Sequence, residues 1–390
     1  MTMIHELPPR ETSGREMIAR VNMQFKAAAF AALKILDNSE VDRVYCDYHD
    51  DFVVRKKVSG GVVYDFYQVK TKGKRNHLWT LAEIFALKKR GQKADAESLK
   101  AIADSFAGRL LVHTVNFGDV CGKVTLLTNI QFHDDVESLV KELQNCIITS
   151  SSGKIIADNL VNIFKLDSTL DKNVVLAWLK KLELEPGVQY IGSEPDDFVA
   201  AARAAIFKYS EIDLTHQEIN EIAESLVSLV HRKSFAKVLT ESTPYELDDI
   251  VGVGIDDMLS ILSISRDVYQ ALLLGEDGSV IKSASIIQRK MKAAGASDSM
   301  IEYCSQQKVK WDLWLRNERH LIPEFDLNFI LDRIQQVQTE WMSSGGSMSD
   351  LQGRIQALRS ESLFSEKTPS LTQELVLGGI LASMVRRKAQ

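Results

Sequence analysis

The spacing of apolar residues changes along the chain and divides it into a mixed first part and a helical second part. Between Ser13 and about Leu36, apolar residues recur every three or four positions, which predicts one long helix. Residues 41–70 hold β-branched and aromatic runs on both sides of a Ser-Gly-Gly segment, which predicts a β-hairpin with residues 41–46 as its lead-in strand. Residues 123–129 place Val124, Leu126 and Leu127 among β-branched threonines, which predicts a central strand.

Further helices are predicted at residues 78–92, 95–107 and 134–146, so helices and strands alternate in the first part. A Thr-Ser-Ser-Ser-Gly run at 149–153 has the composition of a linker. Nearly every segment after it shows helical spacing, up to a second Ser- and Gly-rich linker at 343–349. These patterns predict a layered α/β or α+β core followed by a helical region.

The helical region carries its own start and packing signals. A Thr-His-Gln-Glu sequence at 215–218 is a capping box in front of a helix. The final helix, at 372–387, is unusually apolar, so it must dock on its own domain or on another subunit. We therefore expect three domains, at residues 1–150, 151–342 and 343–390. The second is expected to be helical, and the helices of the third are expected to make assembly or partner contacts.

Composition and charge narrow the class of protein. The 390-residue chain has a net charge of −6, but residues 1–133 hold 20 Lys/Arg against 15 Asp/Glu. This local basic excess fits a nucleic-acid face and equally an ordinary solvated surface. The four cysteines are scattered without a CxxC pair, so we expect reduced thiols rather than a zinc site or a disulfide frame. No apolar run reaches 18 residues and the first residues lack a signal-peptide pattern, so we expect a cytoplasmic protein without a membrane segment.

The candidate chemistry lies on the two arms of the predicted hairpin. Asp50 and Asp51 begin the first arm, and Gln68 and Lys70 end the second. Side chains alternate between the faces of a strand, so Gln68 and Lys70 point the same way, roughly 7 Å apart. The hairpin can bring the carboxylates opposite that pair. Each half alone also fits ordinary turn chemistry or a solvated lysine, and their combination favours a catalytic site.

Two carboxylates, an amide and an ammonium on one face suit a hard divalent cation. We expect Asp51, with Asp50, to bind Mg²⁺ or Mn²⁺, because such ions prefer oxygen ligands. The carbonyl oxygens of Gln68 and Val69 can complete the coordination. Lys70 can orient or deprotonate the attacking water and offset the charge that builds up during phosphodiester cleavage.

Three polar residues lie near this cluster, and two of them have two possible roles each. Gln24 lies on or beside the buried stripe of the first helix, where it is either a satisfied core residue or reaches the site. His49, inside the acidic cluster, either contacts the metal or is a surface histidine. Asp47 is a further carboxylate in the same segment.

A basic segment follows the candidate lysine directly. Residues 55–93 contain 11 Lys/Arg and only two acidic residues, and Lys72, Lys74 and Arg75 are the nearest to the site. Lys and Arg supply the phosphate contacts that carry most non-specific DNA affinity. We therefore expect these three residues to bind DNA, while a solvated basic loop is the alternative.

The same residues carry a resemblance to a known group of enzymes. Asp51, an apolar strand, and then Gln-Val-Lys ending at Lys70 resemble the signature of the PD-(D/E)xK nuclease superfamily. The wider layout resembles the double-stranded-DNA endonuclease domain of bacterial anti-phage effectors of the Cap-four type. That layout comprises residues 10–15, Gln24, and the segments 47–51, 67–71 and 126–132. Family members often have Glu where this chain has Asp47.

The resemblance implies a fold and a function. It implies an α/β restriction-endonuclease-like core, a mixed sheet flanked by helices, in residues 1–150, with a mostly α-helical C-terminal region. It also implies metal-dependent hydrolysis of duplex DNA, with Asp51, Gln68 and Lys70 as catalytic residues and Gln24 as a possible site residue. From the residues themselves we add Asp50 as a second catalytic carboxylate, Asp47 and His49 as possible supporting residues, and, from the basic segment, little sequence specificity.

Relatives of this length resemble the nuclease subunit that pairs with a HerA-type hexameric ATPase. The chain itself has no P-loop motif, so the motor would be a separate protein. We also expect a homo-oligomer and a role in phage defence. The alternatives are a catalytically inactive DNA-binding or scaffold subunit of such a complex, and an RNase with the same core.

Overall fold

The computed structural model contains two compact units. The first comprises residues 1–203 and 223–258, and the second comprises residues 204–222 and 259–390. Each unit is described by itself. The structure describes residues 13–37, 40–73, 76–88, 93–167, 170–192, 196–209, 214, 216–238, 242–262, 269, 291, 297–318, 321–345, 347–361, 364 and 371–386.

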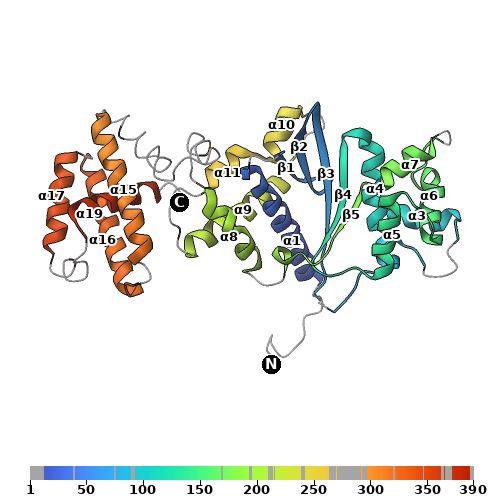
Figure 1. The fold of residues 1–390 in the computed structure, drawn as a ribbon, viewed down its shortest axis with the longest axis horizontal. Coiled ribbons are helices and arrows are strands. Elements are labelled where there is room, and N and C mark those ends of the chain that lie inside the picture. Colours follow the sequence, from blue (N-terminus) through green and yellow to red (C-terminus); the bar gives the residue numbers. More distant parts are fainter. Residues whose placement is uncertain are drawn as a thin grey trace, which may run out of the picture. The chain divides into compact units, whose positions relative to one another are not determined.

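A mixed six-stranded sheet forms the centre of the first unit (Figure 1). Its strands lie in the order β5-β4-β3-β2-β1-β6. The pairs β1–β2, β2–β3 and β1–β6 are antiparallel, whereas β3–β4 and β4–β5 are parallel. The strands are β1 (Val41–Tyr48), β2 (Asp50–Val58), β3 (Gly61–Lys70), β4 (Cys121–Thr128), β5 (Leu182–Glu185) and β6 (Gly252–Val253).

The predicted hairpin and the predicted central strand are both confirmed. Strands β2 and β3 pair in continuous register from Phe52 opposite Tyr67 to Val58 opposite Gly61. The turn between them has Gly60 at φ 106°, a left-handed conformation that glycine adopts without a steric penalty. Strand β4 lies between β3 and β5, and its second half is buried, as its apolar sequence requires.

Helices cover both faces of this sheet (Figure 1). Helix α1 (Ser13–Leu33), followed by the short η2 (Lys34–Asp37), packs on β1, β2 and β3, so the predicted first helix is confirmed. Helix α4 (Phe106–Phe117) packs on β3 and β4. The other helices of this unit are α2 (Leu81–Phe85), α3 (Ala96–Asp104), α5 (Asp134–Asn145), α6 (Ser151–Phe164), α7 (Lys172–Leu179), α10 (Pro244–Ile250) and most of α9 (His216–Ser234).

Two of the predicted helices have different limits. The helix predicted at 78–92 is only the five-residue α2, because Ala86 turns to φ 55° and ends it, and residues 89–92 lie outside the described part. The helix predicted at 95–107 ends at Asp104. Ser105 is extended and its side chain accepts a hydrogen bond from the Gly108 amide, so a separate helix, α4, begins at Phe106.

The predicted linker at 149–153 is wrong. Ser150 is the N-cap of α6, and its hydroxyl accepts from the amide of Gly153. The Glu142 carboxylate of the preceding helix binds the amides of Thr149 and Ser150, which fixes the connection. A serine-rich run is therefore a helix start here, and the compact unit that contains the sheet continues to Arg203.

Part of the first unit comes from far along the chain. Strand β6, only two residues long, pairs with Val44 and Tyr45 at the edge of β1. The Asp248 carboxylate, just before it, forms an ion pair with Arg55 at 3.1 Å and accepts a 2.6 Å hydrogen bond from the Tyr45 hydroxyl. The sequence did not predict this edge strand, because two residues carry no periodicity.

The second unit is helical where it is described. Its helices include α15 (Asp298–Glu318), α16 (Glu324–Ser343), α17 (Met348–Ser360) and α19 (Gln373–Arg386), with α11 (Ile255–Ile261) and α8 (Asp197–Tyr209) shared in part with the first unit. The apolar final helix α19 packs against α15, α16 and α17, and Val376, Ile380 and Leu381 are buried there. It therefore docks on its own unit.

The remaining predictions concern boundaries and environment. The linker predicted at 343–349 contains the turn between α16 and α17, with Gly345 at φ 100°. The capping box predicted at 215–218 begins at Thr215, which lies outside the described residues. All four cysteines are free thiols. Within the described part of the chain, no helix has the length and apolar character needed to cross a bilayer.

Candidate functional site

The acidic cluster forms the tight turn from β1 into β2. Only His49 separates the two strands, and Tyr48 pairs with Asp50. Asp47 and His49 both adopt left-handed backbone conformations, at φ 49° and φ 67°. Asp and His tolerate this region better than most residues, but it still stores strain, and such strain is often found at functional turns. The turn brings Asp50 and Asp51 to the end of the sheet where β3 finishes.

Asp51 is held from three sides. Gln24 of α1 donates its amide hydrogen to Asp51 Oδ1 at 2.7 Å, and the backbone amide of Val69 donates to Oδ2 at 2.6 Å. The Lys70 ammonium lies 4.0 Å from Oδ2. The predicted convergence of the two hairpin arms is therefore found, and Gln24 reaches the site rather than only filling the core.

The environment of Asp51 is unfavourable for a charged carboxylate. Burial raises the pKa of Asp51 to about 6, against the lowering effects of Lys70, the Val69 amide and Gln24. Its neighbour Asp50 raises this pKa further. A buried carboxylate with such a raised pKa, close to an ammonium, is typical of a functional site.

Asp50 is held by a residue that the sequence did not reveal. His113 of α4 lies with its Nε2 3.0 Å from Asp50 Oδ2, and the two side chains are 9% and 7% exposed. The His113 ring is stacked on Phe66 of β3, with ring centroids 4.5 Å apart. Asp50 Oδ1 accepts from the Asp51 amide at 2.9 Å. The signal for His113 was weak, because 63 residues separate it from Asp50 and α4 was not recognised.

Gln68 carries the clearest sign of a missing partner. It follows Tyr67, which pairs with Phe52, so Gln68 lies one position beyond that pair, next to Asp51 along the hairpin. The residue is 7% exposed, and its Oε1 is buried without a hydrogen-bond partner among the described residues. A buried amide oxygen without a partner is unfavourable, and an ion or water can satisfy it.

The side chains of these residues supply the kind of ligand atoms that a hard divalent cation prefers. Asp50 and Asp51 supply carboxylate oxygens and Gln68 supplies an unpartnered amide oxygen, which are the ligands that Mg²⁺ prefers. Within the described residues, no group of three or more His, Cys, Asp or Glu side chains is arranged to hold a metal. Amide or backbone oxygens and water would therefore have to complete the coordination.

Lys70 is held in place by an aromatic ring. Its ammonium lies 5.0 Å from the ring centroid of Phe106, the first residue of α4. The side chain is 22% exposed. A cation over an aromatic face is attracted by the ring electrons, so α4 positions the lysine beside Asp51. Phe106 falls at the end of the helix predicted at 95–107, but the sequence did not predict the break at Ser105 or the extension of α4 to Phe117.

The predicted basic loop is only partly described. Lys72 forms an ion pair with Glu83 at 2.5 Å and lies 4.3 Å from the ring centroid of Trp79. Its contacts are therefore within the protein. Burial raises the pKa of Glu83, but the hydrogen bonds from Lys72, Thr80 and His77 outweigh it and lower this pKa to about 2. Lys74 and Arg75 lie outside the described residues.

Asp47 and His49 border the site rather than enter it. Both are exposed, and no hydrogen bond joins either side chain to Asp51 in the described residues. Burial, and after it the Asp50 carboxylate, raise the pKa of Asp47. Burial and then His113 lower the pKa of His49, so it favours the neutral form. The His49 ring contacts Tyr48 and Phe117 edge-on.

The fold and the site together define a class of protein: an α/β domain with buried acids, an amide and a lysine at one strand end. The family model of the Cap4 dsDNA endonuclease domain matches residues 12–234, more than half of the chain. The chain therefore belongs to the Cap4 dsDNA endonuclease domain family.

Solved structures add a more distant likeness. The chain resembles the Acinetobacter baumannii Cap4 SAVED/CARF-domain containing receptor, at 11% identity and a TM-score of 0.34 over 64% of this chain and 47% of that one. The complex of that receptor with the cyclic trinucleotide 3'3'3'-cAAA matches at 10% identity and a TM-score of 0.35, over 64% and 48%. The chain thus spans about half the length of these structures. No curated protein matches it.

Proposed function

We propose that this protein is a divalent-metal-dependent endonuclease that cuts duplex DNA with little sequence specificity in bacterial defence against phage. Membership of the Cap4 dsDNA endonuclease family supports the substrate and the role in defence. The main structural observation is the position of Lys70 4.0 Å from Asp51, at the hairpin end that also holds Gln68, whose buried Oε1 has no hydrogen-bond partner among the described residues. We further propose that the core is of the PD-(D/E)xK type, because Asp51 at the start of β2 and the Gln-Val-Lys segment at the end of β3 converge at one end of the hairpin.

Each site residue has a distinct task in this proposal. Asp51 and Asp50 hold Mg²⁺ or Mn²⁺ with the Gln68 amide oxygen, and the bound ion supplies Lewis-acid stabilisation of the phosphodiester. Lys70 orients the attacking water and offsets the negative charge that develops on the phosphate. Gln24 and His113 do not touch the substrate. They hold Asp51 and Asp50 in position through the 2.7 Å and 3.0 Å contacts.

Cleavage is expected to depend on a divalent ion. Supercoiled plasmid should be nicked or linearised in Mg²⁺ or Mn²⁺, remain intact in EDTA, and be cut again when Mg²⁺ is added in excess. Gel electrophoresis separates closed, nicked and linear plasmid. Cleavage of a closed circle identifies an endonuclease, because a circle has no ends for an exonuclease to attack. Cleavage that persists in EDTA would contradict the metal proposal. Binding without cleavage under every condition would support the inactive-scaffold alternative, and faster cleavage of duplex RNA would support the RNase.

Replacing His113 is expected to weaken the site through Asp50. In His113→Ala the buried Asp50 carboxylate loses its partner, and losing such a support typically costs about 10–100-fold in metal affinity or activity. The Mg²⁺ concentration at half-maximal cleavage should rise, and His113→Gln, which keeps a donor, should recover part of the loss. A loss of rate at saturating Mg²⁺ with unchanged metal dependence would instead indicate a general structural defect.

Lys72, Lys74 and Arg75 remain proposed DNA contacts. The double variant Lys74→Ala/Arg75→Ala should bind duplex DNA more weakly, and by a similar factor for all sequences. Its binding constant should also depend less steeply on salt concentration, because fewer phosphate contacts release fewer counterions. Filter binding in Ca²⁺ at several salt concentrations measures this slope. Lys72 is a poor choice for the test, because its removal also breaks the ion pair with Glu83.

We also propose that the protein assembles into a homo-oligomer and pairs with a HerA-type hexameric ATPase. The apolar final helix α19 packs inside its own unit, so its apolar face does not supply the assembly contact. Large apolar side chains remain exposed in the same unit, with Leu321 at 75% and Phe325 at 79%.

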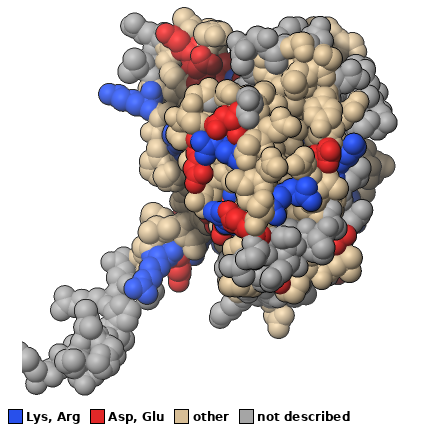
Figure 2. Space-filling view, turned by 90° about the vertical axis from the view of Figure 1, so that its left-hand side faces the viewer, with Lys and Arg blue, Asp and Glu red and all other residues tan. Residues whose placement is uncertain are grey.

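On the side drawn in Figure 2, basic and acidic side chains are interspersed, without a single-sign patch.

The assembly proposal has a direct test. Light scattering should give a mass above the 43.7 kDa of one chain, and Leu321→Asp/Phe325→Asp should lower it. The matched control is Phe207→Asp, which changes a side chain exposed at 40%. A monomeric wild-type protein would contradict the homo-oligomer. Failure to co-purify with a co-expressed HerA-type ATPase would contradict the partner.

A further inference from the structure

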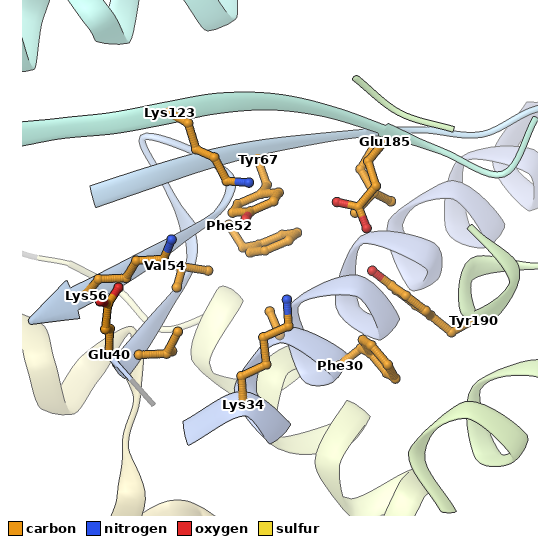
Figure 3. A pocket seen from close by; sticks show the side chains of 13 residues that line it. Phe30, Lys34, Glu40, Phe52, Val54, Lys56, Tyr67, Lys123, Glu185 and Tyr190 are labelled. Atoms are coloured by element: carbon orange, nitrogen blue, oxygen red, sulfur yellow. The ribbon is translucent and has the colours of Figure 1, made fainter. Parts of the chain in front are cut away.

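A cavity lies on the α1 side of the sheet, and Phe52 and Tyr67, the chain neighbours of Asp51 and Gln68, line part of it. Its volume is about 340 Å³, and it is bounded by α1, η2, strands β1 to β5, and the segment around η4 (Gln189–Ile191). Figure 3 shows the side chains that line it. Ligand pockets usually measure about 300–1,000 Å³, so this cavity suits a small ligand with one ring system.

Two pairs of aromatic rings form the walls of this cavity. Phe52 and Tyr67 are stacked, with centroids 4.6 Å apart and planes 5° apart. Phe30 and Tyr190 are stacked in the same way, at 4.0 Å and 15°. The two pairs lie on different sides of the cavity in Figure 3. Flat aromatic walls favour a flat, π-rich ligand, because ring stacking contributes beyond simple area burial.

The polar groups of the cavity are separated by type. In Figure 3 the ammonium groups of Lys34, Lys56 and Lys123 point into the cavity from η2 and from strands β2 and β4, whereas Glu185 and the Tyr190 hydroxyl lie together on another side. Burial, and after it the Glu185 carboxylate, raise the pKa of the Tyr190 phenol, so this group stays a hydrogen-bond donor. The cavity therefore offers a carboxylate and a hydroxyl to one end of a ligand and ammonium groups to the other.

The charge balance limits how anionic the ligand can be. Glu40 also lines the cavity, so three lysines face two glutamates. Lys56 is also paired with the buried Asp65 at 2.6 Å, and Lys123 with Glu183 at 2.6 Å. A triphosphate or a cyclic oligonucleotide would exceed both this charge and the volume. A single phosphate fits the volume, and it would share the ammonium groups of Lys56 and Lys123 with their carboxylate partners Asp65 and Glu183.

We propose that this cavity binds a nucleoside monophosphate. The base stacks against the aromatic pairs, Glu185 accepts hydrogen bonds from base N–H groups, and the lysines contact the phosphate. Because an amino acid carries its ammonium and carboxylate on the same carbon, it does not match the separated polar groups. This proposal is independent of the nuclease function and would stand if that function proved wrong.

The test is calorimetric titration of the full chain with AMP, GMP, CMP and UMP. EDTA is present throughout, so that metal-bridged binding at Asp50 and Asp51 does not contribute. At least one monophosphate should bind saturably with one site per chain. Its parent nucleoside and inorganic phosphate should each bind at least about tenfold more weakly, because each supplies only half of the contacts.

Two variants act by different mechanisms. Lys34→Ala removes an ammonium from the exposed rim, and Ala31→Phe fills the space without changing any charge. Each should weaken binding by at least about tenfold. Lys100→Ala, an exposed lysine on α3, is the matched control and should bind like wild type. Thermal melting verifies folding, and if Ala31→Phe unfolds, Lys34→Ala alone decides.

Three results would overturn the proposal. They are no saturable binding of any monophosphate at millimolar concentration, equal affinity in wild type and both folded variants, or binding of tryptophan in place of nucleotides. Neither Lys34 nor Ala31 belongs to the candidate nuclease site. Variants that lose nucleotide binding but still cleave DNA would therefore show that the two sites act separately.

Discussion

Lys70→Met is expected to reduce plasmid cleavage by about 10²–10³-fold while the protein stays folded. The substitution removes the ammonium that lies 4.0 Å from Asp51 Oδ2. Methionine keeps an unbranched, apolar stem against Phe106, so the packing on α4 is largely preserved. Because Lys70 lowers the pKa of Asp51, its loss also shifts that carboxyl further toward the neutral form, which binds a cation poorly.

The matched control for this variant is Lys57→Met. Lys57 lies on the same hairpin, but its side chain is 71% exposed and, among the described residues, its one ion pair is with Asp42, at 3.6 Å. Exposed pairs of this kind contribute little, so cleavage should remain near the wild-type rate. Rates from single-turnover cleavage of labelled duplex separate chemistry from product release. If Lys70→Met cuts as fast as Lys57→Met, the role assigned to Lys70 is wrong.

Asp51→Asn is expected to abolish cleavage and to stabilise the folded protein at neutral pH. The carboxylate is removed as a metal ligand, so activity should fall by about 10³-fold or more. The pKa of Asp51 in the folded protein is about 6, against an ordinary value of 3.8, so ionised Asp51 opposes folding. Two pKa units correspond to at most about 3 kcal/mol. The neutral asparagine avoids this cost, and Gln24 can rotate its amide to keep a hydrogen bond.

The sign of this effect changes with pH in a defined window. Below about pH 4 the carboxyl is protonated in both the folded and unfolded states, so wild type and Asp51→Asn should melt at similar temperatures. Between about pH 4 and 6 the folded protein holds the proton more strongly, so the stability of the wild type falls as pH rises. Above about pH 6 the variant should melt several degrees higher.

Melting curves at pH 4 and pH 8 measure this difference. Addition of Mg²⁺ at pH 8 should narrow it, because a bound cation stabilises the wild-type carboxylate and not the asparagine. A suitable control is Asp42→Asn. The Asp42 carboxylate forms an ion pair with the Arg55 guanidinium at 2.9 Å, so this substitution should lower the melting temperature. A lower melting temperature for Asp51→Asn at pH 8 would contradict the raised pKa.

The sequence predicted the hairpin, the acidic cluster and the Gln-Val-Lys segment because these signals are local. A Ser-Gly-Gly turn between β-branched runs fixes the register, and the register brings Gln68 next to Asp51. Gln24 could be proposed because helical spacing places it beside a buried stripe. His113 and Phe106 could not, because they belong to α4, whose start depends on the Ser105 cap rather than on apolar spacing.

Other misassignments have the same cause. The Ser-rich segment at 149–153 has the composition of a linker, but its role as the α6 cap depends on Glu142 from the preceding helix. Strand β6 is too short for any pattern and forms only because Asp248 anchors the segment to Arg55 and Tyr45. The apolar final helix could dock inside or outside its unit, and its packing on α15 and α16 decides this.

The sequence alone therefore determined which side chains this protein brings to one end of its hairpin, since alternation and turn chemistry act over a few residues. Only the tertiary structure decided which neighbours hold them: His113 on Asp50, Gln24 on Asp51 and the Phe106 ring under Lys70. Those contacts join elements far apart in the chain. They depend on how helices pack on the two faces of the sheet, and no local pattern encodes that packing.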